Sequence, residues 1–268
     1  FSDALLFAPE NKTYIAMRAD VLAELQQYDL ALQDINHLLH REPQSAALHF
    51  EKGSICLRSN DTICALNAFV QATEYDSQNP ANWSALGLVQ LMLNQPDNAL
   101  ASLSKSIEYG SKWAGDYINR GIIYYRKHNY RNALADYDKA VTLAPSDAQC
   151  YYNRGVLRQE VGDYNRALED FSQAILLAPE QIEMYYQRGM ILLQLQQWQK
   201  ALQDFNTIMQ RYPYFLPAYY LAAQAQTALG HGKQAYQLRQ QAYLMEQKKD
   251  SIQSLQTQMQ VADYQPQQ

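Results

Sequence analysis

The chain has 268 residues, of which 47 % are hydrophobic and 18 % charged, with a formal net charge of −5, so it has enough apolar side chains for a sizeable core. A mildly acidic balance without an extended basic face argues against nucleic acid as a partner. No stretch approaches the ~20 continuous apolar residues of a membrane span, and we expect none.

The chain opens on a pattern that returns later. The first ten residues, FSDALLFAPE, match FSQAILLAPE at 171–180 in the spacing of phenylalanine, alanine and proline. The later stretch has the features of a helix end closed by proline. We therefore expect the chain to begin inside a second helix, in a fragment or a mature chain cut from a longer array with further repeats upstream.

From residue 12 the sequence repeats every 34 residues without an insertion. A small residue marks each repeat, at Ala19, Gly53, Gly87, Gly121, Gly155, Gly189 and Ala223. An alanine follows each of these positions twelve residues later. The seven full repeats are 12–45, 46–79, 80–113, 114–147, 148–181, 182–215 and 216–249, after a partial repeat at 1–11. Such a period is typical of a stacked repeat array.

Each repeat predicts two helices joined by a short turn. In repeat 148–181, Gly162 predicts the end of the first helix, because glycine tolerates the left-handed conformation of a helix end. Pro179 predicts the end of the second helix, since proline has no N–H and restricts the residue before it. Gly155 should let the two helices approach closely, and a larger residue there would cost ~1–3 kcal/mol through overpacking.

The repeat resembles the tetratricopeptide repeat (TPR) family, whose signature is an aromatic residue, Leu-Gly, an aromatic residue, Ala, Phe and Pro over 34 residues. The stretch WSALG at 83–87 carries the opening of that signature. The resemblance covers about residues 1–249. It implies an all-α fold, in which helix pairs stack into a right-handed α-α superhelix, and a concave surface that binds a peptide or a segment of a partner protein.

Two repeats depart from the family pattern. Repeat 80–113 has Pro96 at the turn between its helices and Ser106 where alanine is usual. Repeat 46–79 has His49 in place of the leading aromatic residue. We expect local irregularity in these two repeats before any others.

An arginine precedes the small residue in four repeats, where the family usually has an apolar residue, and an aspartate stands sixteen residues later. The pairs are Arg18 and Asp34, Arg120 and Asp136, Arg154 and Asp170, and Arg188 and Asp204. An unpaired charge on a packed helix face is costly, so we expect an ion pair within each of these repeats. The alternative is a row of arginine clamps for acidic ligands.

Residues that carry catalysis or bind metals form no recognisable pattern. Cys56, Cys64 and Cys150 are an odd number without C-x-x-C spacing, which argues against a disulfide framework or a zinc site and favours buried apolar residues. His37 and His40 have no third ligand in register, which favours a helix surface. No G-x-S-x-G, Cys–His or H-E-x-x-H pattern occurs. We expect no catalytic residue, metal or cofactor.

Beyond the last full repeat, an apolar stripe continues through 250–262 without a proline. We expect helix to about residue 262 that caps the open face of the last repeat, because terminal repeats need such a cover. The rest of 250–268, with Pro266, should form a frayed tail.

A further stripe, here called the first-helix stripe, lies one residue past the packed positions of each first helix. After the leading residue it contains Ala16, Phe50, Ser84, Ile118, Tyr152, Tyr186 and Tyr220. After the small residue it contains Asp20, Ser54, Leu88, Ile122, Val156, Met190 and Gln224. From repeat 46–79 onward it is largely apolar and aromatic, whereas a solvated face would be polar. It either pads contacts between neighbouring repeats or lines a groove.

The sequence predicts a non-catalytic scaffold that binds a protein or peptide partner in an apolar-aromatic groove. The candidate binding residues are Phe50, Ile118, Ile122, Tyr152, Val156, Gln159, Tyr186, Met190, Tyr220 and Gln224. Some TPR co-chaperones hold a terminal carboxylate with Lys and Asn in these positions, and apolar residues there disfavour an acidic tail. The alternatives are the recognition arm of a larger enzyme or sensor, and end-to-end self-association. The compartment stays open between the cytoplasm and, after removal of an upstream signal peptide, the periplasm or exterior.

Overall fold

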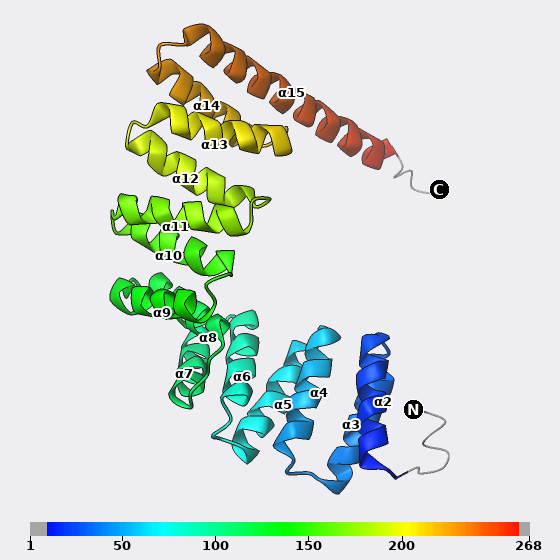
Figure 1. Ribbon diagram of the computed structural model, residues 1–268. Coiled ribbons are helices and arrows are strands. Elements are labelled where there is room, and N and C mark those ends of the chain that lie inside the picture. Colours follow the sequence, from blue (N-terminus) through cyan, green and yellow to red (C-terminus); the bar gives the residue numbers. More distant parts are fainter. Residues whose placement is uncertain (1–9, 263–268) are drawn as a thin grey trace. The chain divides into compact units, whose positions relative to one another are not determined.

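The computed structural model describes residues 10–262, with side chains up to residue 247. This part of the chain contains fourteen helices, α2 to α15, and no strand (Figure 1). None of these helices is long and apolar enough to span a membrane. The helix remnant predicted at 1–9 lies outside the described residues.

The first compact unit extends to Ala144 and contains four helix pairs. The pairs are α2 (Lys12–Glu24) with α3 (Tyr28–Arg41), α4 (Ala46–Arg58) with α5 (Thr62–Tyr75), α6 (Pro80–Met92) with α7 (Pro96–Glu108), and α8 (Ala114–Arg126) with α9 (Tyr130–Leu143). In each pair the second helix packs against the first, and the next pair stacks on that second helix.

The second compact unit begins at Pro145 and contains three pairs. They are α10 (Ala148–Glu160) with α11 (Tyr164–Leu177), α12 (Ile182–Gln194) with α13 (Trp198–Arg211), and α14 (Leu216–Ala228) with α15 (Gly232–Ala262). The pairs stack in chain order, as they do in the first unit.

Tight turns between paired helices follow from residues in the left-handed conformation. Gly162 and Gly230 have φ angles of 82° and 81°, which glycine adopts without a steric cost. Asn60 takes the same role with φ 63°, and asparagine tolerates it better than most residues. Asp61 then caps α5 by accepting a hydrogen bond from Cys64 N at 2.9 Å. The sequence around each turn therefore ends one helix and starts the next.

The small residue of each repeat allows the close approach that the sequence predicts. A Cβ atom added at Gly189 would lie 2.8 Å from Phe205 Cε1, and one at Gly121 would lie 2.6 Å from Tyr137 Cε1. Carbon atoms do not approach so closely without displacement, so only glycine fits against these rings.

Neighbouring pairs bury one another through a repeated contact. Ile191 on α12 packs against Ala167 and Phe171 on the preceding helix α11. In the first unit, Ile123 on α8 packs in the same way against α7. Each pair thus lacks a complete core of its own and depends on its neighbour for burial.

The two departing repeats behave differently from each other. In repeat 46–79 the expectation of irregularity is wrong, because the His49 ring nitrogen Nε2 lies 2.9 Å from Pro43 O. Tyr151 makes the equivalent bond through its hydroxyl, to Pro145 O at 3.2 Å. A hydrogen-bonding ring satisfies that carbonyl in both cases, so histidine replaces the aromatic residue without disturbing α4 or α5.

Repeat 80–113 is irregular at its end rather than at Pro96. The proline occupies the first turn of α7, where its missing N–H is harmless. The helix instead ends early, with Gly110 at φ 89° and Ser111 N bonded to Ser106 O at 3.0 Å. This glycine-terminated end shapes the following loop, 109–113.

The cysteine prediction is wrong for two of the three residues. Cys56 on α4 and Cys64 on α5 form a disulfide, with their Cα atoms 5.7 Å apart. The turn between the helices brings together two residues that sequence spacing alone did not pair. Cys150 is buried as predicted, and burial raises the pKa of its thiol to about 11, with a further contribution from Asp147.

Helix α15 continues to Ala262, which confirms helix to about residue 262. The predicted capping contacts of 250–262 fall on side chains outside the described ones and stay a prediction. The predicted frayed tail lies outside the described residues altogether.

Candidate partner-binding surface

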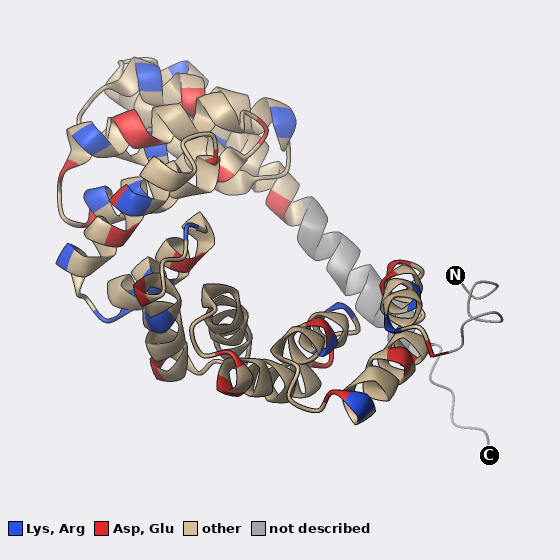
Figure 2. Cartoon of the chain, turned by 60° about the horizontal axis from the view of Figure 1, so that its bottom comes forward, with Lys and Arg blue, Asp and Glu red and all other residues tan. Residues whose placement is uncertain are grey.

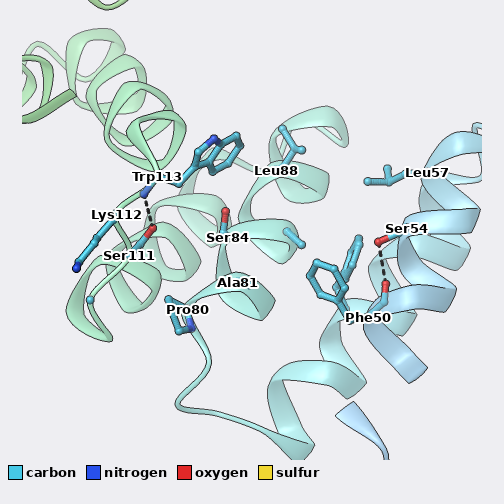
Figure 3. A pocket seen from close by; sticks show the side chains of 13 residues that line it. Phe50, Ser54, Leu57, Pro80, Ala81, Ser84, Leu88, Ser111, Lys112 and Trp113 are labelled. Atoms are coloured by element: carbon cyan, nitrogen blue, oxygen red, sulfur yellow. Dashed lines mark hydrogen bonds between the residues drawn. The ribbon is translucent and has the colours of Figure 1, made fainter. Parts of the chain in front are cut away.

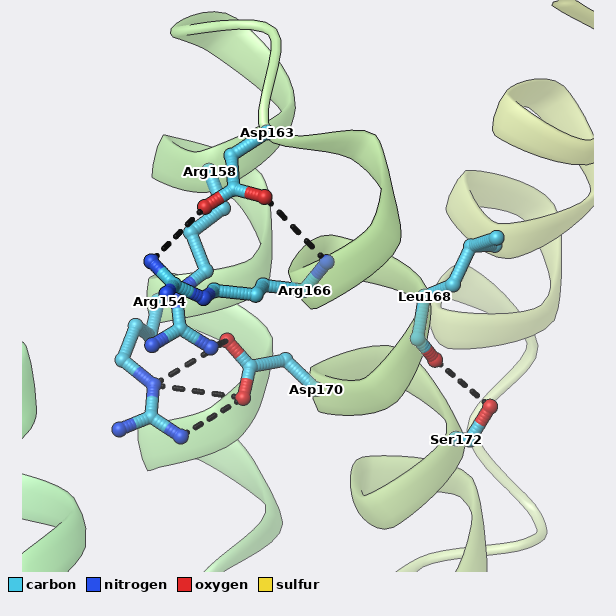
Figure 4. A network of polar contacts seen from close by, with 7 residues as sticks. All are labelled: Arg154, Arg158, Asp163, Arg166, Leu168, Asp170 and Ser172. Carbon is cyan, nitrogen blue, oxygen red and sulfur yellow. Dashed lines mark hydrogen bonds and ion pairs between the residues drawn. The ribbon is translucent and has the colours of Figure 1, made fainter. Parts of the chain in front are cut away.

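All four predicted arginine–aspartate pairs form within their repeats. Arg154 donates from Nη2 to Asp170 Oδ1 at 2.7 Å, and Arg158 adds a second guanidinium at 2.8 Å from Asp170 Oδ2 (Figure 4). The other bonds are Arg18 Nε to Asp34 at 2.7 Å, Arg120 Nη2 to Asp136 at 2.7 Å and Arg188 Nη2 to Asp204 at 2.6 Å. Each aspartate is buried. The arginines are engaged inside the fold, which disfavours a row of ligand clamps.

The first unit has an apolar pocket of about 450 Å³ on the surface of its first helices (Figure 3). The first-helix stripe contributes Phe50, Ser54, Ser84 and Leu88 to its lining. The loop 109–113 contributes Trp113, and Leu57 and Ala85 complete much of the wall. The stripe thus lines a hollow in this part of the chain.

Trp113 is the pocket residue that sequence reasoning missed. Its side chain is 53 % exposed, which is unusual for tryptophan. The indole lies against Gly115, where an added Cβ atom would come within 2.7 Å of the ring. The neighbouring Lys112 side chain extends away from the other lining side chains (Figure 3). The signal in the sequence that could have identified this residue is a tryptophan between two predicted helices, two residues before Gly115.

A buried carboxylate fixes the helices beneath the pocket. Asp116 on α8 is fully buried and accepts a hydrogen bond from Ser84 Oγ at 2.6 Å. Ser106 Oγ lies 2.7 Å from its other oxygen, which explains why serine replaces the usual alanine there. The Ser84 hydroxyl donates to this carboxylate and the Ser54 hydroxyl donates to Phe50 O at 3.0 Å, so these two pocket hydroxyls already have hydrogen-bond acceptors.

The remaining candidates of the first unit differ in exposure. Ile118 is buried and offers little surface to a partner. Ile122 is half-buried. Ile118 therefore packs between helices, as the first of the two interpretations predicts. The stripe residues that line the pocket fit the groove interpretation instead.

In the second unit, the tyrosines of the first-helix stripe are only partly covered. Tyr152 is half-buried and meets Phe171 edge-on, with ring centroids 5.9 Å apart. Tyr186 is half-buried and meets Phe215 in the same way at 5.7 Å. Tyr220 is exposed, and its hydroxyl donates to Glu246 Oε2 at 3.3 Å. These contacts hold the rings in place while leaving part of each accessible.

The other candidates of the second unit surround these rings. Met190 and Gln224 are exposed, and Val156 is half-buried. Gln159 is half-buried, and its Oε1 is buried without a hydrogen-bond partner among the described residues.

The charged residues of the described helices form no surface of a single sign that would favour a partner of the opposite charge (Figure 2). Positive and negative residues are interspersed along the described helices (Figure 2). Within those residues, no group of three His, Cys, Asp or Glu side chains could hold a metal ion. The partly exposed apolar and aromatic side chains of the first-helix stripe are therefore the distinctive feature of the surface.

Glu51 on α4, which lies beside Asp20 of the first-helix stripe, has a raised pKa. Burial raises the pKa of Glu51 to about 7, and the charge of Asp20 and a hydrogen bond with it contribute further. Glu51 Oε1 is also buried without a hydrogen-bond partner in the described part of the chain. Ionised Glu51 is therefore poorly solvated in the folded state.

We expect Glu51→Gln to stabilise the protein at pH 8 by about 1 kcal/mol, a value reduced for solvent screening of a half-buried group. Because the folded pKa is raised, ionisation costs stability fully above pH ~7, and the cost disappears below the unfolded pKa of ~4.3. Urea unfolding at pH 8 and pH 4.5 measures the difference. Exposed Glu108→Gln is the control and should change neither value; an equal effect of Glu51→Gln at both pH values contradicts the expectation.

Several solved structures have a fold similar to that of this chain. A structure of YrrB, described as a TPR protein with an unusual peptide-binding site, is 22 % identical, covers 73 % of this chain and 100 % of its own, and has a TM-score of 0.63. A TPR protein from Parabacteroides merdae is 17 % identical, with 91 % and 96 % coverage and a TM-score of 0.63. PilF of Pseudomonas aeruginosa is 19 % identical, with 80 % and 97 % coverage and a TM-score of 0.63. These similarities confirm the all-α repeat fold.

Family comparison agrees with the helix pairs and their packing. A tetratricopeptide repeat model matches residues 121–180, and a second model of the same description matches residues 16–62 and 152–214. No curated protein matches the chain in sequence. With the 34-residue period, the stacked helix pairs and these matches in both compact units, the chain belongs to the tetratricopeptide repeat family.

Proposed function

We propose that the chain is a non-catalytic scaffold that binds an extended peptide or segment of a partner protein on its first-helix stripe. TPR proteins generally act as scaffolds for protein partners, and the apolar pocket beside Trp113 is the observation that carries the finer proposal. A large, exposed aromatic ring beside an apolar hollow is a common feature of binding hot spots.

The chemistry of the pocket favours an apolar side chain of the partner. Its walls include Phe50, Leu57 and Leu88, and the Ser54 and Ser84 hydroxyls in its lining already donate within the protein. A polar side chain entering it would lose water without gaining a partner, whereas an apolar one would bury surface favourably. The half-exposed tyrosines of the second unit would provide a second contact area for the same kind of ligand. The peptide-binding site in the description of YrrB supports this choice by analogy.

We expect peptides selected from a displayed random library on the purified chain to share an apolar anchor residue. Leu88→Glu should weaken their binding by about 30-fold or more, because it places a charge in the apolar pocket. Titration of a labelled peptide by fluorescence anisotropy measures the change.

A matched control is Ile63→Glu, which adds the same charge at an exposed apolar residue of second helix α5. It should leave the affinity unchanged. Selection of no peptide, or equal binding by the wild-type chain and Leu88→Glu, would overturn the proposed site.

A further inference from the structure

The Cys56–Cys64 disulfide belongs to the same apolar cluster as one side of the pocket. Cys56 lies in this cluster with Phe69, and Cys64 packs against it. Phe50 and Leu57 on α4 pack against the same cluster. Phe50, Leu57 and Phe69 also line the pocket, and we call these three residues the pocket wall (Figure 3). The disulfide therefore joins α4 and α5, the two helices that form this wall.

The helix pair does not need this disulfide to form. The other six repeats contain the same two helices without one, and another repeat, for example, has Leu192 and Lys200 at the equivalent positions. Hydrogen bonds also hold the turn between α4 and α5, from Asp61 N to Cys56 O at 2.8 Å and from Cys64 N to Asp61 Oδ1 at 2.9 Å. Disulfides replace a core mainly in small domains, and this chain has an extensive core. The disulfide is thus available for a role other than holding the fold.

The two cysteines differ in their access to solvent. Cys56 is fully buried, whereas Cys64 at the start of α5 is only half-buried. Thiol–disulfide exchange begins when a thiolate reaches one sulfur of the bond, so access selects the sulfur that is attacked. Cys64 Sγ is therefore the entry point for a reductant.

We propose that this disulfide is a redox control of the pocket, which a dithiol reductant switches. In the oxidised form the disulfide holds the pocket wall in the arrangement that accepts an apolar anchor. Reduction loosens the wall and weakens binding of the anchor. This inference rests on the proposed function, because it concerns the regulation of the same pocket.

The exchange has two steps. A thiolate of the dithiol forms a bond to Cys64 Sγ, while Cys56 Sγ leaves with the electron pair of the broken bond and takes up a proton. The second thiolate of the reductant then displaces Cys64 Sγ, which also takes up a proton. Two electrons pass to the protein, which gains two thiol groups, and the reductant becomes a disulfide.

Reduction affects the pocket wall through packing. Two sulfur atoms that are no longer bonded must move apart to van der Waals contact. Cys56 has no free space around it, so this movement displaces its neighbours in the cluster. The edge-on contact between Phe50 and Phe69, with ring centroids 5.4 Å apart, crosses from α4 to α5 and depends on how these helices pack. A ligand of the reduced chain must then order the wall itself, which lowers its affinity.

The first test compares the two redox forms of the full chain with a labelled peptide selected on the oxidised form. Fluorescence anisotropy should show binding weakened by about 10-fold in dithiothreitol, because the ligand now orders two or three side chains of the wall. Removal of dithiothreitol and addition of oxidised glutathione should restore the affinity. Mass spectrometry after alkylation of the denatured chain verifies each form. Free thiol groups at Cys56 and Cys64 after oxidation, or equal affinity in the two forms, would overturn the inference.

Cys64→Ser is the matched variant, because it removes the bond by changing one atom of a half-buried residue. Its peptide affinity should equal that of the reduced wild type, and dithiothreitol should not change it. The variant retains Cys150. A variant that responds to dithiothreitol like the wild type would place the effect outside the disulfide and overturn the inference.

Hydrogen exchange without peptide separates this inference from the proposed function. Reduction should speed amide exchange in 46–75, which contains α4 and α5, and leave the equivalent helices in 148–177 unchanged. Equal exchange of 46–75 in both forms overturns the inference, whatever the peptide does. Faster exchange in a chain that selects no peptide supports redox control of the wall and overturns the proposed function alone.

Discussion

Replacing Asp170 with alanine should lower the free energy of unfolding by about 3 kcal/mol or more. The carboxylate is buried and accepts hydrogen bonds from Arg154 and Arg158, whose side chains are each 15 % exposed. Removal of the carboxylate takes a buried hydrogen-bond acceptor and its charge away from two partly desolvated guanidinium groups, which costs more than the loss of an exposed pair. Urea unfolding at neutral pH measures the change.

Glu169→Ala is the matched control, because Glu169 precedes Asp170 on α11 and is exposed. It should change stability by no more than about 0.5 kcal/mol. An equally small effect of Asp170→Ala would mean that the ion pairs with Asp170 contribute little to stability.

The chain itself suggests a second variant that separates a stranded charge from lost packing. The last repeat has Ala222 and Leu238 where repeat 182–215 has Arg188 and Asp204. Arg188→Ala combined with Asp204→Leu should therefore destabilise less than Asp204→Ala alone, since no charge is left unpaired. A double variant that is less stable than the single one would contradict this explanation.

Replacing Tyr152 and Tyr186 together with alanine should weaken binding of a selected peptide that contacts the second unit by about 1,000-fold, if each ring contributes ~2 kcal/mol. Both rings are half-buried and held edge-on by Phe171 and Phe215, so they are rigid and lose little entropy on binding. Titration calorimetry measures the affinity.

Helicity is the control for this double variant, because the rings also pack within the fold. Circular dichroism at the assay temperature should match the wild type. Tyr243→Ala removes an exposed tyrosine outside the stripe and should leave peptide affinity unchanged. Full affinity in the double variant would restrict the site to the pocket beside Trp113.

Features that recur in several repeats could be predicted from the sequence alone. The 34-residue period and the glycine or small-residue positions predicted the helix pairs and their close approach. The arginine–aspartate pairs were predicted because the sixteen-residue separation recurs in four repeats and is absent where the first residue is Leu86 or Ala222. When the same residue pair returns in several repeats, its two members lie at equivalent places in each helix pair, so their contact can be inferred from the spacing.

Features that occur only once in the chain were decided by the tertiary structure. The Cys56–Cys64 disulfide, the acidic pair of Asp20 and Glu51, and the pocket beside Trp113 each depend on how particular side chains meet across a turn or between neighbouring helix pairs. The 34-residue period identifies which positions face each other. It does not show how the particular side chains of one repeat pack at those positions. Whether a facing pair bonds, repels or leaves a hollow depends on their size, charge and direction, and these are fixed only when the helices pack.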